Sequence, residues 1–177
     1  MQPIIVGIEH IRGPEVPCFI ADYMIDAKQI EQLVTNKIQG SDIFLVEIKV
    51  NTMNQVQIFL DTPQGISIDQ CVEISRFIEE SIDREVEDYS LEVSSPGIGD
   101  PFKVIEQYKK LIEGTIEVLF LNGVKIQGTL KAVSDTDFTM VYSVKEKPLG
   151  AKRPIMVEKE KTIDFSHTKS VKEIIIF

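Results

Sequence analysis

The chain has 177 residues, of which 43% are hydrophobic and 27% charged, and its formal net charge is −9. The length fits one medium domain or two small ones, and no apolar run approaches the roughly 20 residues that a membrane-spanning helix needs. Cys18 and Cys71 are too few for a disulfide framework, so we expect reduced thiols, no membrane partner and a cytoplasmic protein.

The two halves of the chain differ in charge. Residues 1–100 hold 18 Asp and Glu against 6 Lys and Arg, a net charge of −12, whereas residues 101–177 hold 10 against 13, a net charge of +3. Because an acidic surface repels phosphate, the first half favours a basic protein as its partner over naked nucleic acid, while the second half can contact RNA. An alternative explanation of the same charge difference is that the acidic residues serve only to keep the protein soluble.

Residues 1–23 form a separate leader. They contain Pro3, Pro14 and Pro17, show no sustained hydrophobic period, and lack the basic start and apolar block of a signal peptide. We therefore expect poor order in this segment. A second hypothesis is that translation normally starts at Met24.

Residues 24–96 predict an acidic α+β domain. The hydrophobic period indicates a helix from Asp26 to Gly40, and alternation over 44–60 indicates an antiparallel hairpin. A second helix begins at the capping-box sequence Ser67-Ile68-Asp69-Gln70, and a strand over 89–94 follows it. The predicted buried positions of the second helix are Ile68, Cys71, Val72, Ser75, Ile78 and Ile82.

This order predicts a two-layer α/β sandwich in which both helices cover one face of the sheet. KH-type RNA-binding domains have a related layout. The Gly-x-x-Gly loop by which those domains clamp nucleic acid is absent from the sequence, and the second helix is acidic.

The strand over 89–94 stops at a linker. Proline removes a backbone donor and glycine permits positive φ, so the ladder cannot continue through Pro96 and Gly97, and Pro101 stiffens the far end. If φ is positive at Gly97, a valine there disturbs the angle between the domains. We place the linker at 97–101. The residues that mark the linker and the end of the strand before it are Ser94, Ser95, Pro96, Gly97 and Pro101.

Residues 102–177 predict a small β-barrel of SH3-like or Sm-like type. One or two helical turns lead to Gly114, and strands then alternate on either side of the hairpin signal Asn122-Gly123, with Gly128 placed for bending. Further strands are predicted over 138–142, around 155–157 and 163–165, and over 171–177. A basic loop, Lys145 to Pro154, separates the third and fourth strands. Its charge favours contact with phosphate, and a solvated surface loop is the alternative interpretation.

The sequence offers no catalytic constellation. His10 and His167 share no plausible pocket with a Cys or Ser, and Gly97 and Gly99 do not extend into a phosphate-binding loop. The acidic clusters lack the spacing of a Ca²⁺ loop, and the cysteines have no partner histidine for zinc. We expect no enzyme activity, no cofactor and no metal site.

Two motifs resemble a known family. The segment Leu91 to Phe102, LEVSSPGIGDPF, and the helix sequence Asp69 to Arg76, DQCVEISR, are similar to the bacterial ribosome maturation factor family RimP, and the resemblance runs from Met24 to the C-terminus. That family usually has Asp-Arg before the second proline, where this chain has Gly99-Asp100. A role for that arginine therefore cannot be carried over.

The resemblance implies a non-catalytic, cytoplasmic, monomeric assembly factor that binds the free small (30S) ribosomal subunit, with 16S ribosomal RNA as a further partner. Such factors assist late assembly near the decoding region, where a basic small-subunit protein is incorporated. The candidate contacts to that protein are Asp61, Asp69, Glu73, Glu80 and Glu92. The candidate contacts to RNA are Lys145, Lys147, Lys152 and Arg153.

Two alternatives stay open from the sequence. An Sm-like RNA chaperone or RNA-binding regulator would assemble into rings and prefer uridine-rich RNA. An enzyme with its pocket between the domains would show a deep cleft with converging polar side chains.

Overall fold

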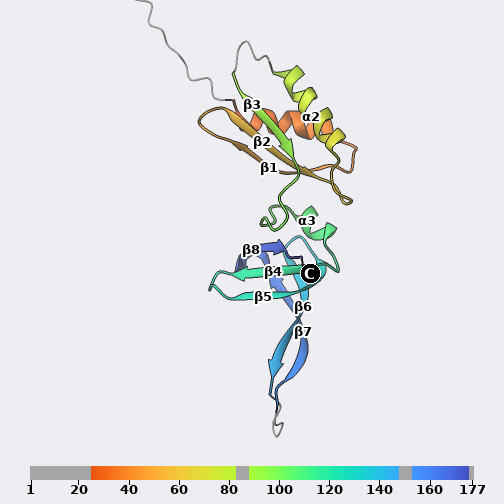
Figure 1. The fold of residues 1–177 in the computed structure, drawn as a ribbon, viewed down its shortest axis with the longest axis vertical. Helices are drawn as coiled ribbons and strands as arrows, with labels where there is room; N and C mark the ends of the chain where they lie inside the picture. The colour runs from red at the N-terminus through yellow and green to blue at the C-terminus, as the bar shows by residue number, and fades with distance from the viewer. Residues whose placement is uncertain (1–24, 83–87, 148–152, 176–177) are drawn as a thin grey trace, which may run out of the picture.

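A computed structural model describes residues 25–82, 88–147 and 153–175. The expectations for the leader at 1–23, for a start at Met24 and for Lys152 lie outside the described residues. Figure 1 shows an N-terminal layer of helices and strands, a connecting segment, and a C-terminal sheet arranged along the long axis. No helix in the described ranges is long and apolar enough to cross a membrane.

The N-terminal layer contains a three-stranded sheet covered by two helices. Its elements are α1 (Ala27–Ile38), β1 (Phe44–Val50), β2 (Gln55–Asp61), α2 (Ile68–Ser81) and β3 (Ser90–Ser94). The strand order is β1-β2-β3, with β1 antiparallel to β2 and β2 parallel to β3. The predicted hairpin is thus confirmed. The parallel pair follows from the helical crossover, because β3 must re-enter the sheet in the direction of β2.

Side-chain caps fix where the two helices begin. The Asp26 carboxylate accepts a hydrogen bond from the backbone N–H of Lys28 at 3.0 Å and starts α1. The predicted capping box of α2 is confirmed, since the Ser67 hydroxyl accepts from Gln70 N at 3.2 Å while Gln70 Oε1 accepts from Ser67 N at 2.9 Å. Each contact satisfies a backbone donor that the first helical turn leaves free.

The predicted buried face of α2 is partly wrong. Ile78 and Ile82 are buried as expected, together with Ile74, but the side chains of Ile68 and Val72 are 82% and 40% exposed. At 3.6 residues per turn, Ile68 and Val72 lie about 80–120° around the helix from Ile78. Because α2 packs on α1 as well as on the sheet, its contact face is centred on Ile74 and Ile78, and the other two lie beyond the edge of the core.

The C-terminal region is a five-stranded antiparallel sheet. Its elements are α3 (Ile105–Lys110), β4 (Thr115–Phe120), β5 (Lys125–Val133), β6 (Asp137–Glu146), β7 (Ile155–Asp164), the short 3-10 helix η1 (Phe165–His167) and β8 (Thr168–Glu173). The strand order is β7-β6-β5-β4-β8. The α+β class is confirmed, whereas closure of this sheet into a barrel stays a prediction.

One strand differs from the expectation. The segments predicted around 155–157 and 163–165 form the single strand β7, except that Phe165 lies in η1. β7 pairs with β6 without interruption from Asp137 opposite Asp164 to Glu146 opposite Ile155. This hairpin extends beyond the rest of the sheet (Figure 1), so no third strand of the described residues lies beside its outer half.

The buried residues form two clusters. One joins α1, α2 and the first sheet, and the other is built on the C-terminal sheet. In the second cluster, the Tyr108 ring packs with its centroid 4.9 Å from that of Phe102 and 5.1 Å from that of Phe165, and burial raises the pKa of its hydroxyl to about 12. Separate cores support the proposed division of the chain at residues 97–101.

Gly128 lies in β5 where strands β5 and β6 approach closely. A Cβ atom at this position would meet the backbone carbonyl oxygen of Val141 and would come within 2.7 Å of Met140 Cε. The backbone carbonyl cannot move without opening the ladder between the strands. The glycine predicted to help the sheet bend is therefore required by close packing.

We expect Gly128→Ala to lower the free energy of unfolding by about 1–3 kcal/mol, as overpacked core sites do. Urea unfolding measures the change. Ser143→Ala, at an exposed position of β6, is the control and should leave the midpoint nearly unchanged. An unaltered midpoint for Gly128→Ala would show that β5 and β6 can separate without cost.

Candidate functional site

The connecting segment turns sharply between the two sheets. Asp100 N donates to Gly97 O at 3.0 Å, and Gly99 has a φ of 86°. Positive φ at the third residue is typical of a type II turn. The expectation of positive φ at Gly97 is wrong, because the turn places Gly99, not Gly97, at the position that needs it.

Asp100 stabilises this turn with its side chain. Its Oδ2 accepts a hydrogen bond from Gly97 N at 2.9 Å, and a Cβ at Gly97 would lie only 2.7 Å from that oxygen. Beyond the turn, Pro101 bridges to Lys172 and Phe102 N donates to Val171 O at 2.8 Å. The segment is therefore fastened to β8, and the aspartate that departs from the family pattern has a structural contact in this chain.

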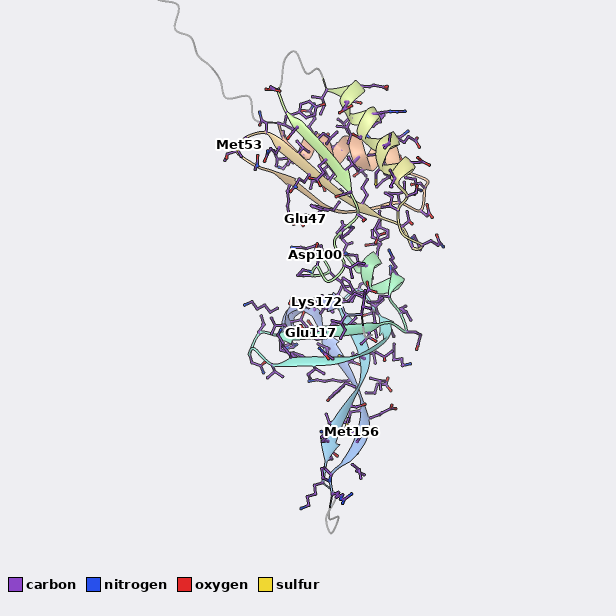
Figure 2. All side chains as sticks on the ribbon, in the orientation of Figure 1. Glu47, Met53, Asp100, Glu117, Met156 and Lys172 are labelled. Carbon is purple, nitrogen blue, oxygen red and sulfur yellow. The ribbon has the colours of Figure 1, made fainter. Side chains whose placement is uncertain are left out.

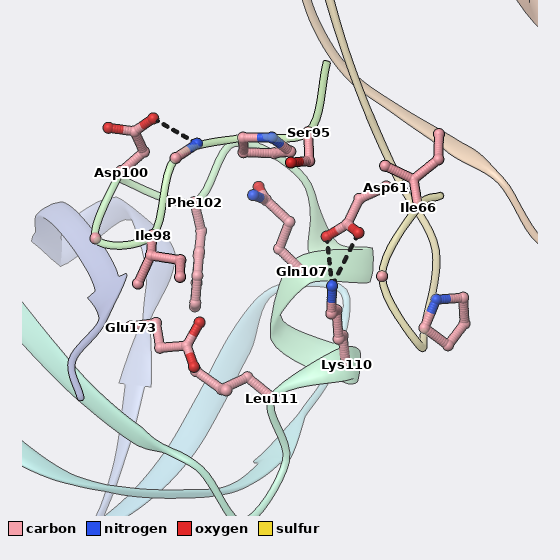
Figure 3. A pocket seen from close by; sticks show the side chains of 15 residues that line it. Asp61, Ile66, Ser95, Ile98, Asp100, Phe102, Gln107, Lys110, Leu111 and Glu173 are labelled. Atoms are coloured by element: carbon pink, nitrogen blue, oxygen red, sulfur yellow. Dashed lines mark hydrogen bonds and ion pairs between the residues drawn. The ribbon is translucent and has the colours of Figure 1, made fainter. Parts of the chain in front are cut away.

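An ion pair joins the N-terminal layer to α3. Both carboxylate oxygens of Asp61, at the end of β2, accept hydrogen bonds from Lys110 Nζ at 2.8 and 2.7 Å (Figure 3). The side chains are only 10% and 31% exposed. The sequence predicts Asp61 as an acid that faces a partner, but the structure encloses its carboxylate in this contact, so we remove it from the proposed partner surface.

A cleft of about 320 Å³ opens beside this ion pair. Three of its polar side chains are engaged within the protein: Asp61 with Lys110, and Gln107, whose Oε1 accepts from the backbone N–H groups of Lys103 and Val104 at 2.7 and 3.3 Å. Figure 3 shows Ile98 and Phe102 on the opposite wall. Among the described residues, no group of three or more His, Cys, Asp or Glu is placed to hold a metal ion. The cleft joins two parts of the molecule, and its paired charges do not form a nucleophile and base.

Three of the predicted acids lie together on α2. We call Asp69, Glu73 and Glu80 the acidic face; they line one depression together with the cations Lys37 and Arg76. Lys37 Nζ donates to Glu73 Oε1 at 2.7 Å, and this hydrogen bond lowers the pKa of Glu73. Glu73 is thus partly neutralised.

Glu92 is separated from the acidic face by the thickness of the sheet. Leu91 and Val93 of β3 pack against the helix-covered core, so Glu92 points to the uncovered side. There it accepts a hydrogen bond from Gln57 Nε2 at 2.9 Å. The five predicted acids therefore lie in three different places.

Three of the four predicted RNA contacts lie at the end of the β6–β7 hairpin. We call its outer part, residues 143–147 and 153–158, the distal hairpin. Lys145, Lys147 and Arg153 are all exposed there. The sequence predicts a loop on the rim of a barrel, whereas the structure carries these cations away from the sheet on a two-stranded arm, with Met156 on its flank (Figure 2).

Sequence reasoning missed the apolar part of this arm. Ile155 and Met156 are 51% and 60% exposed, and Met156 pairs with Lys145. A signal was present in the sequence, because the period of two in Phe138, Met140 and Tyr142 continues at Val144 up to the basic loop, as expected for a longer strand.

The acidic face and the distal hairpin lie toward opposite ends of the long axis (Figure 1). Each of the two surfaces attracts molecules of the opposite charge.

Comparison with known proteins gives the family. A model of the RimP N-terminal domain matches residues 30–99. The ribosome maturation factor RimP of Porphyromonas gingivalis is 38% identical over 86% of this chain and all of its own length. The factors of Christiangramia forsetii and Flavobacterium psychrophilum are 33% and 36% identical over 78% and 77% of this chain, and over 90% and 88% of their own lengths. The chain belongs to the RimP family of ribosome maturation factors.

We expect the Asp61–Lys110 pair to contribute measurably to stability. In a double-mutant cycle of Asp61→Asn and Lys110→Met, the coupling free energy should exceed about 1 kcal/mol, because little water reaches the carboxylate. Urea unfolding provides the four values.

The matched control is the Glu113–Lys131 pair, whose side chains are 65% and 40% exposed. Its coupling should stay below about 0.5 kcal/mol, as for other surface ion pairs. Equal coupling in both cycles would mean that the contact between β2 and α3 is not held by this ion pair.

Proposed function

We propose that this chain is a non-catalytic assembly factor that binds the free small (30S) ribosomal subunit and helps a basic ribosomal protein incorporate near the decoding region. It acts in the cytoplasm as a monomer. Family membership supports a role in ribosome maturation. The single observation that carries the finer proposal is the separation of the acidic face on α2 from the cations of the distal hairpin.

Two separate acidic surfaces, the acidic face on α2 and Glu92 on the uncovered side of the sheet, supply attraction for a basic protein. Asp69 and Glu80 are exposed on α2, and Glu92 is exposed on β3. Opposite charge raises the rate of encounter and disfavours wrong orientations, and the effect decreases with salt. The same negative charge repels ribosomal RNA. A basic protein bound to these acids therefore has its RNA-binding residues covered and does not contact RNA prematurely.

The distal hairpin supplies the contact to 16S ribosomal RNA. Lys145, Lys147 and Arg153 lie on an arm of two paired strands, beside which the described part of the chain places no third strand. Lysine and arginine bind phosphates without reading sequence, and each contact releases counterions. Exposed Ile155 and Met156 add apolar surface beside these cations.

The proposal is tested by measuring the affinity of residues 24–177 for free small subunits, joined ribosomes and naked ribosomal RNA over a salt series. We expect preference for free small subunits over both other ligands. Equal or tighter binding to naked RNA would contradict the proposal and would favour the RNA-chaperone alternative.

We expect neutralising the distal hairpin to weaken binding to small subunits and to flatten the salt dependence. In the triple variant Lys145→Gln, Lys147→Gln and Arg153→Gln, the slope of log K against log salt should fall by as much as about 2–3.

The charge-matched control replaces Lys109, Lys131 and Lys169, exposed lysines outside the hairpin, by glutamine. It should retain most of the affinity. If both triple variants lose the same affinity, net charge rather than the distal hairpin accounts for the binding.

A further inference from the structure

Strand β3 leaves one edge of the first sheet open. It pairs with β2, and no other described strand lies on its far side. Ser90 N donates to Asn54 O on the β2 side at 3.2 Å. Because the backbone groups of successive strand residues point to opposite sides, Leu91 and Val93 direct their N–H and C=O groups toward the open edge. These groups are a template for another strand.

A mainly apolar groove lies at the C-terminal end of this edge. It has a volume of about 340 Å³ between α2 and the end of β3, and its lining includes Ile68, Cys71, Val72 and Val93 together with four serines. Ile68 is 82% exposed and Val72 40% exposed. Burial raises the pKa of the Cys71 thiol, so it lines the groove as a neutral, weakly polar group. A strand added to β3 would cover these side chains with one of its faces.

The charged residues around the open edge of β3 favour a positively charged binding partner. Glu92 is exposed at the centre of β3 on the uncovered side of the sheet, and Asp69 is exposed in the first turn of α2. A second copy of this chain, paired antiparallel and centred on β3, would place Glu92 beside Glu92, which is unfavourable. RNA would be repelled by the same carboxylates and could not use the row of backbone groups.

We propose that the open edge of β3 binds an extended segment of a basic protein as an additional β-strand. The backbone of Leu91 and Val93 holds the segment, its apolar side chains enter the groove beside Ile68, and its alternate Lys or Arg side chains face Glu92. Strand addition of this kind takes affinity from backbone hydrogen bonds and specificity from alternate side chains. The inference rests on the proposed function for the basic nature of the partner.

The test uses the full chain and a synthetic peptide of alternating lysine and valine with blocked ends. We expect binding to slow hydrogen exchange at the amides of Leu91 and Val93 by tenfold or more, while the amide of Ser90, already bonded to β2, changes little. Binding without protection of Leu91 and Val93, or no binding at all, would overturn the proposal.

Backbone methylation of the peptide tests the pairing itself. Methylating one set of alternate amides should abolish binding, and methylating the other set should preserve it, since only one set points toward β3. Equal effects of the two sets would contradict strand addition.

A variant of the groove provides the matched comparison. Ile68→Asp should weaken peptide binding at least tenfold although it adds a negative charge, because it removes the apolar contact. The control Met53→Asp makes the same charge change at a residue that is 72% exposed in the turn between β1 and β2. Equal affinity of the two variants would overturn the proposal.

The inference and the proposed function can fail separately. If the chain prefers free small subunits but the peptide leaves the β3 edge unprotected, the inference fails and the proposed function stands. If the peptide protects the edge and the chain prefers naked RNA, the edge is a site for basic segments and the proposed function fails.

Discussion

The enclosed ion pair between Asp61 and Lys110 is the contact on which the arrangement of this molecule depends. Asp61 ends β2 and Lys110 ends α3, so the contact joins the last residue of a central strand to the helix that opens the C-terminal region. A lysine at a helix C-terminus also faces the negative end of the helix dipole. With little water near the carboxylate, losing the ammonium would leave a poorly solvated charge, and that cost favours one relative placement of the two regions.

The connecting segment adds to the same constraint. The turn from Gly97 to Asp100 is closed by backbone and side-chain hydrogen bonds, and Phe102 is bonded to β8 immediately afterwards. A second, more exposed ion pair joins Lys103 to Glu47 at 3.7 Å. The short segment is thus held on both sides, by the first sheet and by β8.

This arrangement separates two kinds of surface. Electrostatic interactions are screened over about 8 Å at physiological salt, so the acids on α2 and the cations on the distal hairpin cancel one another little. The groove beside β3 and the central cleft share Ile66 and Ser95 in their linings. A segment that leaves the β3 edge would therefore pass directly toward the cleft and the exposed side chain of Ile98.

The sequence by itself determined the local elements, since their causes lie within a few residues. The capping box at Ser67, the hairpin turn at Asn122-Gly123 and the period of two in the strands are short-range effects, and the structure contains each. They suffice for the α+β class. The family resemblance was also carried by short motifs and is confirmed by the comparisons.

Only the tertiary structure decided which surfaces those elements present. Ile68 and Val72 fit a helical stripe but lie outside the core, because packing of α2 on α1 sets the rotation of the helix. The sequence predicts Asp61 as a surface acid, but in the structure its carboxylate is bound by Lys110, which lies 49 residues away in the chain. The open edge of β3 likewise follows from strand order. Each outcome depends on contacts between residues far apart in the chain, and no local pattern of charge or hydrophobicity specifies such contacts.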